Sequence, residues 1–369
     1  MRHRLTTTLV LLSTIARADA LHAEPPQTAT RVYRNELSPI REPQPLLADH
    51  PEFCEPIVES KHFEAPPLLI DPDADLHVRA WRYSYNARGI IEIPNRLSAE
   101  QTALIMVHPW GIDSGQGWRT PEPAGVADFC TPEKNSVAAR HTREIVRPFI
   151  DSLREHVACV MYSLPGGRDP IRANLYRSLT QTPTESQRIE AARQLDDVLH
   201  SFVYQGEAIP NEITLSTTSP VVDYFRQFPG LDAGPRYNNA GFWNLPIPVS
   251  NDVGMHADDI VIYDAEGYEP LKAFLQEQNI RHVLLTGYAT DMCVCRTTAG
   301  YENLSRDFNV FIVGDATLAT FPANRSPRIA VNAALSLAAL NHLITQVSWV
   351  KLQEPGTSDG TAAGETDAE

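Results

Sequence analysis

The sequence has no long hydrophobic run and no excess of positive charge. No apolar segment reaches the roughly 18–20 residues that a membrane-spanning helix needs. The 369 residues include 31 Lys and Arg against 46 Asp and Glu, a formal net charge of −15. Because this charge repels nucleic acids and anionic lipids, we exclude a function that depends on binding either of them through bulk charge. The composition, 43% apolar and 21% charged, is that of a globular protein.

Cysteine is also scarce, and the N-terminus indicates the compartment of the five cysteines. Residues 1–20 combine a basic start, a short apolar stretch and a small-x-small cleavage sequence, the arrangement of a secretory signal peptide. An uncleaved amphipathic helix is the alternative. We expect a secreted or periplasmic protein that leaves the membrane after cleavage. In that oxidising compartment, Cys54 and Cys130 are the expected disulfide pair because both lie in loop-like sequence. The odd total leaves at least one thiol unpaired unless the chain dimerises through it.

Proline is not scarce, but its distribution is local. Ten of the 29 prolines fall between Pro25 and Pro72, and we predict that residues 21–75 form an extended arm laid over the rest of the protein. Residues 76–100 have the alternating pattern of a β-hairpin. The acidic tail, residues 351–369, is predicted to be disordered.

Apolar segments alternate with amphipathic helical segments over residues 101–350. The predicted strands are 103–108, 157–162, 259–263, 282–287 and 309–316. The predicted helices are 134–156, 186–202, one that begins at Pro270, 291–304 and 326–344. Near-continuous apolar strands between such helices indicate an α/β fold with a parallel sheet covered on both faces. Residues 206–258 interrupt this alternation and are interpreted as an insertion or lid over the strand ends.

Residues capable of chemistry follow three of the predicted strands, where ligands bind in open α/β sheets. They are His108, Asp264 and the segment 287–293, which ends in Cys293. A cysteine at the start of a helix is favoured as thiolate by the helix dipole, and the nearby backbone amides can hold an oxyanion. A buried, unreactive cysteine is the alternative interpretation.

One stretch resembles the signature of the isochorismatase-like cysteine hydrolases. Residues 282–316 read HVLLTGYATDMCVCRTTAGYENLSRDFNVFIVGDA, which matches the family patterns TG-x-x-T-x-x-CV-x-x-T and V-x-x-x-x-DA. The matching positions are Gly287, Thr290, Cys293, Val294, Thr297, Asp315 and Ala316. The resemblance implies a three-layer α/β sandwich around a six-stranded, mostly parallel sheet. It also implies that Cys293 is the nucleophile, that the amides of Ala289 and Cys293 form the oxyanion hole, and that the Tyr288–Ala289 peptide is cis.

Two positions depart from the family pattern. The family has an aspartate after the first strand and a lysine after the third, where this sequence has His108 and Asp264. A histidine beside a carboxylate can deprotonate a thiol directly, so the set His108, Asp264 and Cys293 remains chemically coherent. The connection after the third strand is short, so Asp259 or Glu266 are alternatives to Asp264.

The remaining site predictions concern the substrate and metals. Trp110, Tyr288 and Trp243 are candidate substrate-binding residues, and Asp113 is an alternative acid. The Asp-x-His spacing with which nicotinamidase-like relatives hold a metal is missing after the first strand, so we predict no metal and no other cofactor.

Three functions remain open at this stage. The leading hypothesis is an exported hydrolase that uses Cys293 on an amide-like C–N bond of a small molecule. The second is a catalytically silent small-molecule-binding protein on the same fold, and the third is an assembly protein that uses its arm and hairpin. Because members of the family often oligomerise, the resemblance implies a homo-oligomer.

Overall fold

The computed structural model describes residues 30–109, 132–201, 212–227, 249, 251–319 and 345–353. Residues 35–369 form one unit and residues 1–34 form another. Residues 30–34, the described part of the smaller unit, have no regular secondary structure. The predictions for the signal peptide, Cys130 and the helix 326–344 lie outside the described residues, and the disulfide between Cys54 and Cys130 stays a prediction. No helix in the described ranges is long and apolar enough to span a membrane.

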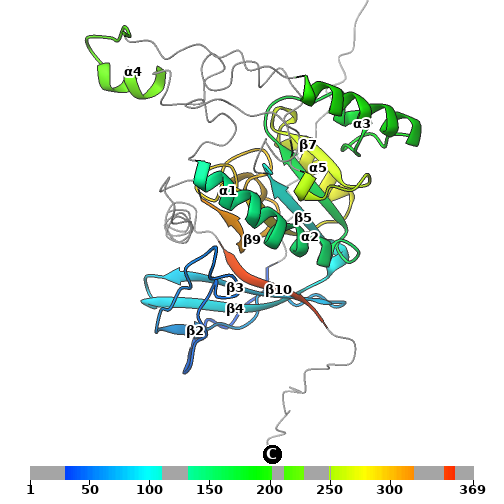
Figure 1. The fold of residues 1–369 in the computed structure, drawn as a ribbon. Helices are drawn as coiled ribbons and strands as arrows, with labels where there is room; N and C mark the ends of the chain where they lie inside the picture. Colours follow the sequence, from blue (N-terminus) through cyan, green and yellow to red (C-terminus); the bar gives the residue numbers. More distant parts are fainter. Residues whose placement is uncertain are drawn as a thin grey trace, which may run out of the picture. The chain divides into compact units, whose positions relative to one another are not determined.

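A ten-stranded sheet runs through the larger unit (Figure 1), in the order β1-β2-β4-β3-β10-β9-β8-β5-β6-β7. The strands are β1 Ser38–Ile40, β2 His62–Glu64, β3 Leu76–Ser84, β4 Gly89–Leu97, β5 Thr102–Val107, β6 Cys159–Leu164, β7 Ile260–Tyr263, β8 His282–Tyr288, β9 Asn309–Leu318 and β10 Gln346–Leu352. The neighbours from β10 to β7 are all parallel. They are the six-stranded parallel sheet that the family resemblance implied.

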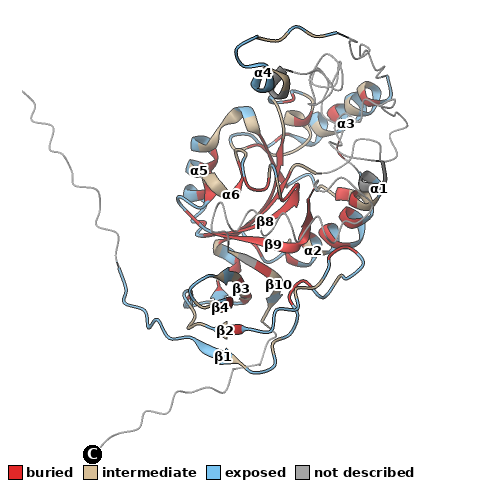
Figure 2. Ribbon diagram, turned by 90° about the vertical axis from the view of Figure 1, so that its left-hand side faces the viewer, coloured by how far each residue is buried: buried red, intermediate tan, exposed pale blue. Residues whose placement is uncertain are grey.

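Helices cover both faces of the parallel part. The α-helices are α1 Pro132–His141, α2 Arg147–Leu153, α3 Glu185–His200, α4 Pro220–Gln227, α5 Tyr268–Glu277 and α6 Tyr301–Leu304. Because side chains alternate along a strand, Leu104 and Met106 of β5 pack in one core with Ile150 of α2, whereas Ile105 packs in a second core with Leu271 of α5. Figure 2 shows the buried strands β8 and β9 between α5 and α6 on one side and α1 and α2 on the other. The fold is therefore the predicted three-layer α/β sandwich.

The N-terminal region extends the sheet beyond β10. The predicted hairpin is present as β3 and β4, and β3 pairs antiparallel with β10. β2 and β1 continue the sheet from β4. The arm also contributes Leu47 and Phe53, which are 0% and 1% exposed. Burial of these two side chains explains why the arm lies against the protein despite its high proline content.

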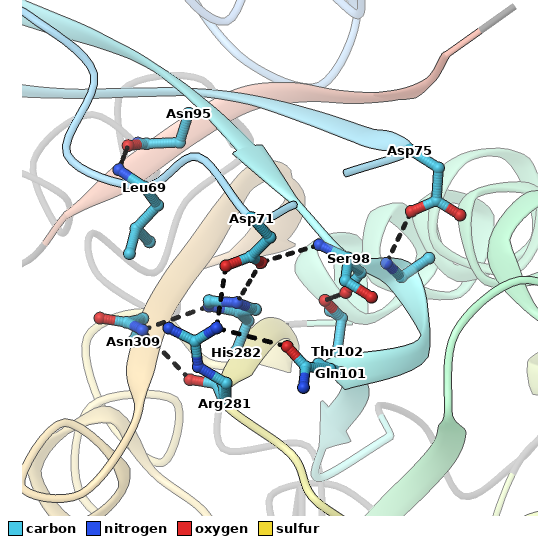
Figure 3. A network of polar contacts seen from close by, with 11 residues as sticks. Leu69, Asp71, Asp75, Asn95, Ser98, Gln101, Thr102, Arg281, His282 and Asn309 are labelled. Atoms are coloured by element: carbon cyan, nitrogen blue, oxygen red, sulfur yellow. Dashed lines mark hydrogen bonds and ion pairs between the residues drawn. The ribbon is translucent and has the colours of Figure 1, made fainter. Parts of the chain in front are cut away.

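A polar cluster joins the arm to the start of the parallel strands (Figure 3). Asp71 Oδ2 accepts a hydrogen bond from the Ser98 amide and lies 2.9 Å from His282 Nε2. Arg281 Nη1 donates to Asp71 Oδ1 and to Gln101 Oε1. Burial opposes ionisation of Asp71, but the Ser98 amide and His282 outweigh it and lower the pKa of this carboxyl. Asp71 is thus a charged anchor for a segment that has little regular structure.

Two predicted helices differ from the observed ones. The helix 134–156 contains a π-helical turn, Thr142–Val146, between α1 and α2. Pro148 lies in the first turn of α2, where its missing N–H group removes one α-helical hydrogen bond. The helix predicted over 291–304 is wrong for most of its length, because only α6 is helical and residues 290–300 form turns and bends.

Candidate active site

His108 lies directly after β5 and has an unusual backbone conformation. Its φ of 40° is in the left-handed region, which few non-glycine residues adopt and which is often found at functional sites. The His108 amide donates to the carbonyl of Ser163 on the neighbouring strand β6. This contact fixes the chain where it leaves the sheet and presents the imidazole at the carboxyl ends of the strands.

The imidazole contacts both of its predicted partners. His108 Nε2 lies 3.0 Å from Asp264 Oδ2, and the side chain also forms a hydrogen bond with Cys293. The two partners come from different elements: Asp264 begins the 3₁₀-helix after β7, and Cys293 lies in the turns after β8. The structure therefore brings the three predicted residues together.

Asp264 is held by two hydroxyl groups. Thr297 Oγ1 donates to Asp264 Oδ1 at 2.6 Å, and Thr298 Oγ1 donates to the Asp264 carbonyl at 2.7 Å. The two alternatives to Asp264 have other contacts. Asp259 accepts hydrogen bonds from Arg154 and from the His256 amide, and Glu266 accepts one from the Tyr263 amide. Asp264 is the carboxylate that faces the imidazole.

The electrostatics of the site favour a charged imidazolium. Burial opposes the charge on His108, but hydrogen bonds with Asp264 and Cys293 outweigh it and raise the pKa of His108 to about 9. Burial likewise opposes ionisation of Asp264, and the contact with His108 lowers the pKa of that carboxyl. At neutral pH the pair is an imidazolium and a carboxylate beside Cys293.

Cys293 lies in a series of turns and not at the start of a regular helix. The amides of Met292 and Val294 both donate to the Ala289 carbonyl, and the Cys295 amide donates to Met292. The argument from a helix dipole at Cys293 is therefore wrong, because no regular helix begins there. The thiol is half-buried against the core that contains α5.

The backbone around Ala289 has the cis peptide that the family resemblance implied. The Tyr288–Ala289 peptide is cis. Among the hydrogen bonds between described residues, none uses the amide of Ala289 or of Cys293 as donor. Within the described residues, both N–H groups are therefore free to donate to another acceptor.

Gly287 permits the close approach of β8 to β5. Its φ is +104°, and a Cβ atom there would lie 2.0 Å from the Val107 carbonyl oxygen. A larger residue would push apart the two strands from which His108 and the Cys293 segment emerge. The glycine of the signature pattern therefore has a steric role in bringing these two segments together.

Of the candidate substrate-binding residues, the structure describes Tyr288, and its side chain is not part of this arrangement. The side chain of Tyr288, 2% exposed, belongs to the core on the other face of the sheet. Its hydroxyl oxygen lies 2.7 Å from His141 Nδ1 and 2.8 Å from Thr142 Oγ1. Trp110 and Trp243 lie outside the described residues, as does the alternative acid Asp113.

The sequence interpretation missed the two threonines that hold Asp264. Thr297 was matched to the family pattern without a role, and Thr298 was not singled out. Two adjacent hydroxyl side chains in a segment expected to be helical are the signal that was available, because Ser and Thr often bond to neighbouring groups in place of continuing a helix. The described part of the chain contains no group of three or more His, Cys, Asp or Glu residues suited to a metal ion.

Comparisons with known proteins point to one family. Residues 255–340 match the model of the isochorismatase domain, a range that includes Asp264, Ala289 and Cys293. This match confirms the resemblance predicted from the sequence. No curated protein matches.

Several solved structures are similar at low identity. A cysteine hydrolase from Pseudomonas syringae pv. phaseolicola is 16% identical over 66% of this chain and 87% of its own, with a TM-score of 0.31. The nicotinamidase PncA from Bacillus subtilis is 14% identical over 67% of this chain and 99% of its own, with a TM-score of 0.30. A pyrazinamidase/nicotinamidase from Streptococcus mutans is 14% identical over the same shares, with a TM-score of 0.32.

Proposed function

We propose that this chain is an exported hydrolase in which Cys293 attacks the carbonyl carbon of an amide-like C–N bond in a small molecule. The observation that carries the proposal is the position of His108, which contacts both the Cys293 thiol and the Asp264 carboxylate. Thiol nucleophiles need a neighbouring base, and that base works best when a third group orients it. The family match over residues 255–340 supports the same assignment of the cysteine.

The proposed reaction has two stages. In the first, the proton of the Cys293 thiol is held on His108 as an imidazolium. The thiolate attacks the carbonyl carbon, whose oxygen becomes negative and accepts hydrogen bonds from the amides of Ala289 and Cys293. The imidazolium then donates its proton to the departing nitrogen as the C–N bond breaks, which leaves a thioester on Cys293. In the second stage His108 removes a proton from water, the hydroxide attacks the thioester, and the carboxylic acid leaves as the thiol is restored. Asp264 stabilises the imidazolium throughout.

The test is the alkylation rate of each cysteine as a function of pH, followed by mass spectrometry of the peptides. We expect Cys293 to react with an inflection below the free-thiol value of about 8.5, because the imidazolium stabilises its thiolate. Cys159 and Cys295 are internal controls, since burial raises the pKa of each to about 12. An inflection for Cys293 at or above 8.5 would contradict the proposal and favour the silent binding protein.

The matched variant is His108→Asn. Asparagine tolerates the left-handed backbone of position 108 better than most residues, so the variant keeps the local fold while it removes the base. In a library of small amides we expect turnover to fall by about 10²-fold or more, the usual effect of losing a general base. Unchanged turnover together with unchanged alkylation kinetics would show that His108 has no part in the reaction.

A further inference from the structure

A second site candidate lies on the antiparallel extension, outside the cluster of His108, Asp264 and Cys293. A pocket of about 490 Å³ is lined by side chains from β2, β3, β4 and β10 and by the segment between β2 and β3. Its polar lining consists of His77, Arg79, Arg96, Asn95 and Glu64, and its apolar lining includes Trp349 and Ile70.

The strand register places His77, Arg96 and Lys351 in one row. His77 and Arg96 line the pocket, and Lys351 lies beside the lining residue Trp349. Lys351 of β10 is directly opposite His77 of β3, and His77 is directly opposite Arg96 of β4. Directly opposed residues of antiparallel strands share a face of the sheet. Lys351 and Arg96 therefore flank His77 on one face, across three adjacent strands. Two cationic side chains on either side of one imidazole are unexpected in a chain with a net charge of −15.

The nearby carboxylates do not neutralise this row. Glu64, the acidic residue of the lining, accepts a hydrogen bond at 2.9 Å from Arg79, which also pairs with Glu92. None of the ion pairs between described residues includes Arg96 or Lys351. The Nε2 atom of His77 is buried and has no hydrogen-bond partner among the described residues. Arg96 and Lys351 therefore retain hydrogen-bond donors that no carboxylate of the described residues uses.

An aromatic side chain adjoins these charges. The Lys351 ammonium lies 4.9 Å from the centre of the Trp349 ring, two residues earlier on the same strand. Ile70 adds further apolar surface at the pocket and is 46% exposed. Flat apolar surface beside a few convergent polar groups is the usual composition of a small-molecule site.

We propose that this pocket binds a small organic anion, whose carboxylate or phosphate group contacts Arg96, Lys351 and His77 and whose flat apolar part packs against Trp349. The charge-assisted hydrogen bonds of Arg and Lys supply the strongest contacts available to such a group. The inference does not depend on the proposed hydrolase activity, because no residue of this pocket belongs to the cluster around Cys293.

The experiment is calorimetric titration of the full chain with benzoate and with phenyl phosphate, which distinguish the two kinds of anion. We expect saturable binding of at least one of them at one site per chain. Benzylamine, which has the same ring and a positive charge, is expected not to bind. Failure of both anions to saturate, or equal binding of benzylamine, would refute the site.

Variants locate the binding. Arg96→Gln and Lys351→Gln are each expected to weaken it about tenfold or more, the effect of losing one charge-assisted contact. Arg41→Gln removes an exposed charge outside the pocket and is expected to bind as the unaltered chain does. Thermal unfolding followed by circular dichroism checks that each variant is folded. Binding that survives Arg96→Gln and Lys351→Gln unchanged would place the anion elsewhere, including at the cluster around Cys293, and would overturn the proposal.

Discussion

His108 Nε2 lies 3.0 Å from Asp264 Oδ2, although the two residues are 156 positions apart and their strands, β5 and β7, are not neighbours. Strand β6 lies between them, and the His108 amide is bonded to Ser163 of that strand. The left-handed backbone of His108 therefore turns the chain over the end of β6, and the imidazole reaches the carboxylate beyond it. Because of this geometry, the negative charge of Asp264 acts directly on the imidazole of His108.

The first prediction concerns the pKa of His108. In Asp264→Asn the carboxylate that favours the imidazolium is lost while burial still opposes it, so the pKa of His108 should fall well below its value of about 9. An NMR titration of the ring measures this directly. Glu266→Gln is the matched control, because it removes a charge from the same 3₁₀-helix without touching His108.

The pKa of His108 sets the upper limit of the pH range in which the thiolate–imidazolium pair exists. A thiolate–imidazolium pair persists up to the pKa of the imidazolium, so a lower value in Asp264→Asn narrows that range from its alkaline side. Alkylation of Cys293 at neutral pH should fall accordingly. The same inflection for His108 in both proteins would contradict the role assigned to Asp264.

The second prediction concerns Thr297, whose hydroxyl donates to Asp264 Oδ1 at 2.6 Å. Thr297→Val keeps the shape but leaves that oxygen without its donor, so Asp264 is free to turn away from His108. A hydrogen bond to a charged group contributes about 1.5–3 kcal/mol, and we expect alkylation of Cys293 to slow by about tenfold. Thr297→Ser keeps the hydroxyl and should restore the rate. If serine and valine behave alike, the hydroxyl does not position Asp264.

The third prediction separates steric conflict from backbone strain. Gly287→Ala places a Cβ atom 2.0 Å from the Val107 carbonyl oxygen at a φ of +104°, and we expect it to lower the free energy of unfolding by about 4 kcal/mol or more. Gly267→Ala has a similar φ of +84° but no atom within 4 Å of its Cβ. Its cost should be about 1–3 kcal/mol, that of the backbone conformation alone, because a φ of 84° with a ψ of 168° is a combination that few residues other than glycine adopt. Urea unfolding of both variants tests the difference, and equal losses would show that the Val107 contact is relieved by small shifts.

The sequence predicted the parts of the fold that its apolar pattern encodes. β5, β7 and β8 are almost entirely apolar, so their existence and their carboxyl ends, where His108 and Asp264 lie, followed from the pattern. β10 was not predicted, because Gln346–Leu352 mixes polar and apolar residues and pairs on both sides with strands that are distant in sequence. β1 and β2 have only three residues each, too few for any periodicity.

The sequence predicted which residues form the site but not the backbone conformation around them. The apolar residues after Cys293 have a spacing compatible with a helix, which favoured the prediction over 291–304. The hydroxyls of Thr297 and Thr298 bind Asp264 instead, a contact with a residue from β7 that no local pattern reveals. The sequence showed that His108 stands where the family has an aspartate. It did not show the left-handed φ of His108, which depends on the tertiary contact with β6.

The last prediction concerns Asp315, a buried carboxyl group on β9. Burial, with a smaller contribution from the charge of Asp49, raises the pKa of Asp315 from 3.8 to about 8. Neither of its carboxyl oxygens has a hydrogen-bond partner among the described residues, whereas its backbone carbonyl accepts a bond from His141 Nε2. The folded state therefore keeps the proton of this carboxyl at neutral pH.

This proton makes stability depend on pH in a defined direction. Between pH 3.8 and about 8 the folded state binds the proton and the unfolded state does not, so the Asp315 carboxyl lowers the stability by about 1.4 kcal/mol for each unit of rising pH. Asp315→Asn has the shape of the protonated carboxyl and does not titrate. The stability of the variant relative to the unaltered protein should increase from pH 5 to pH 8 and become constant above pH 8.

Urea unfolding at several pH values measures this difference in stability, in which the contributions of the other titrating groups cancel. Asp258→Asn, at a side chain that is 86% exposed, is expected to show no such increase, and parallel curves for Asp315→Asn would mean that Asp315 is already ionised in the folded state at neutral pH.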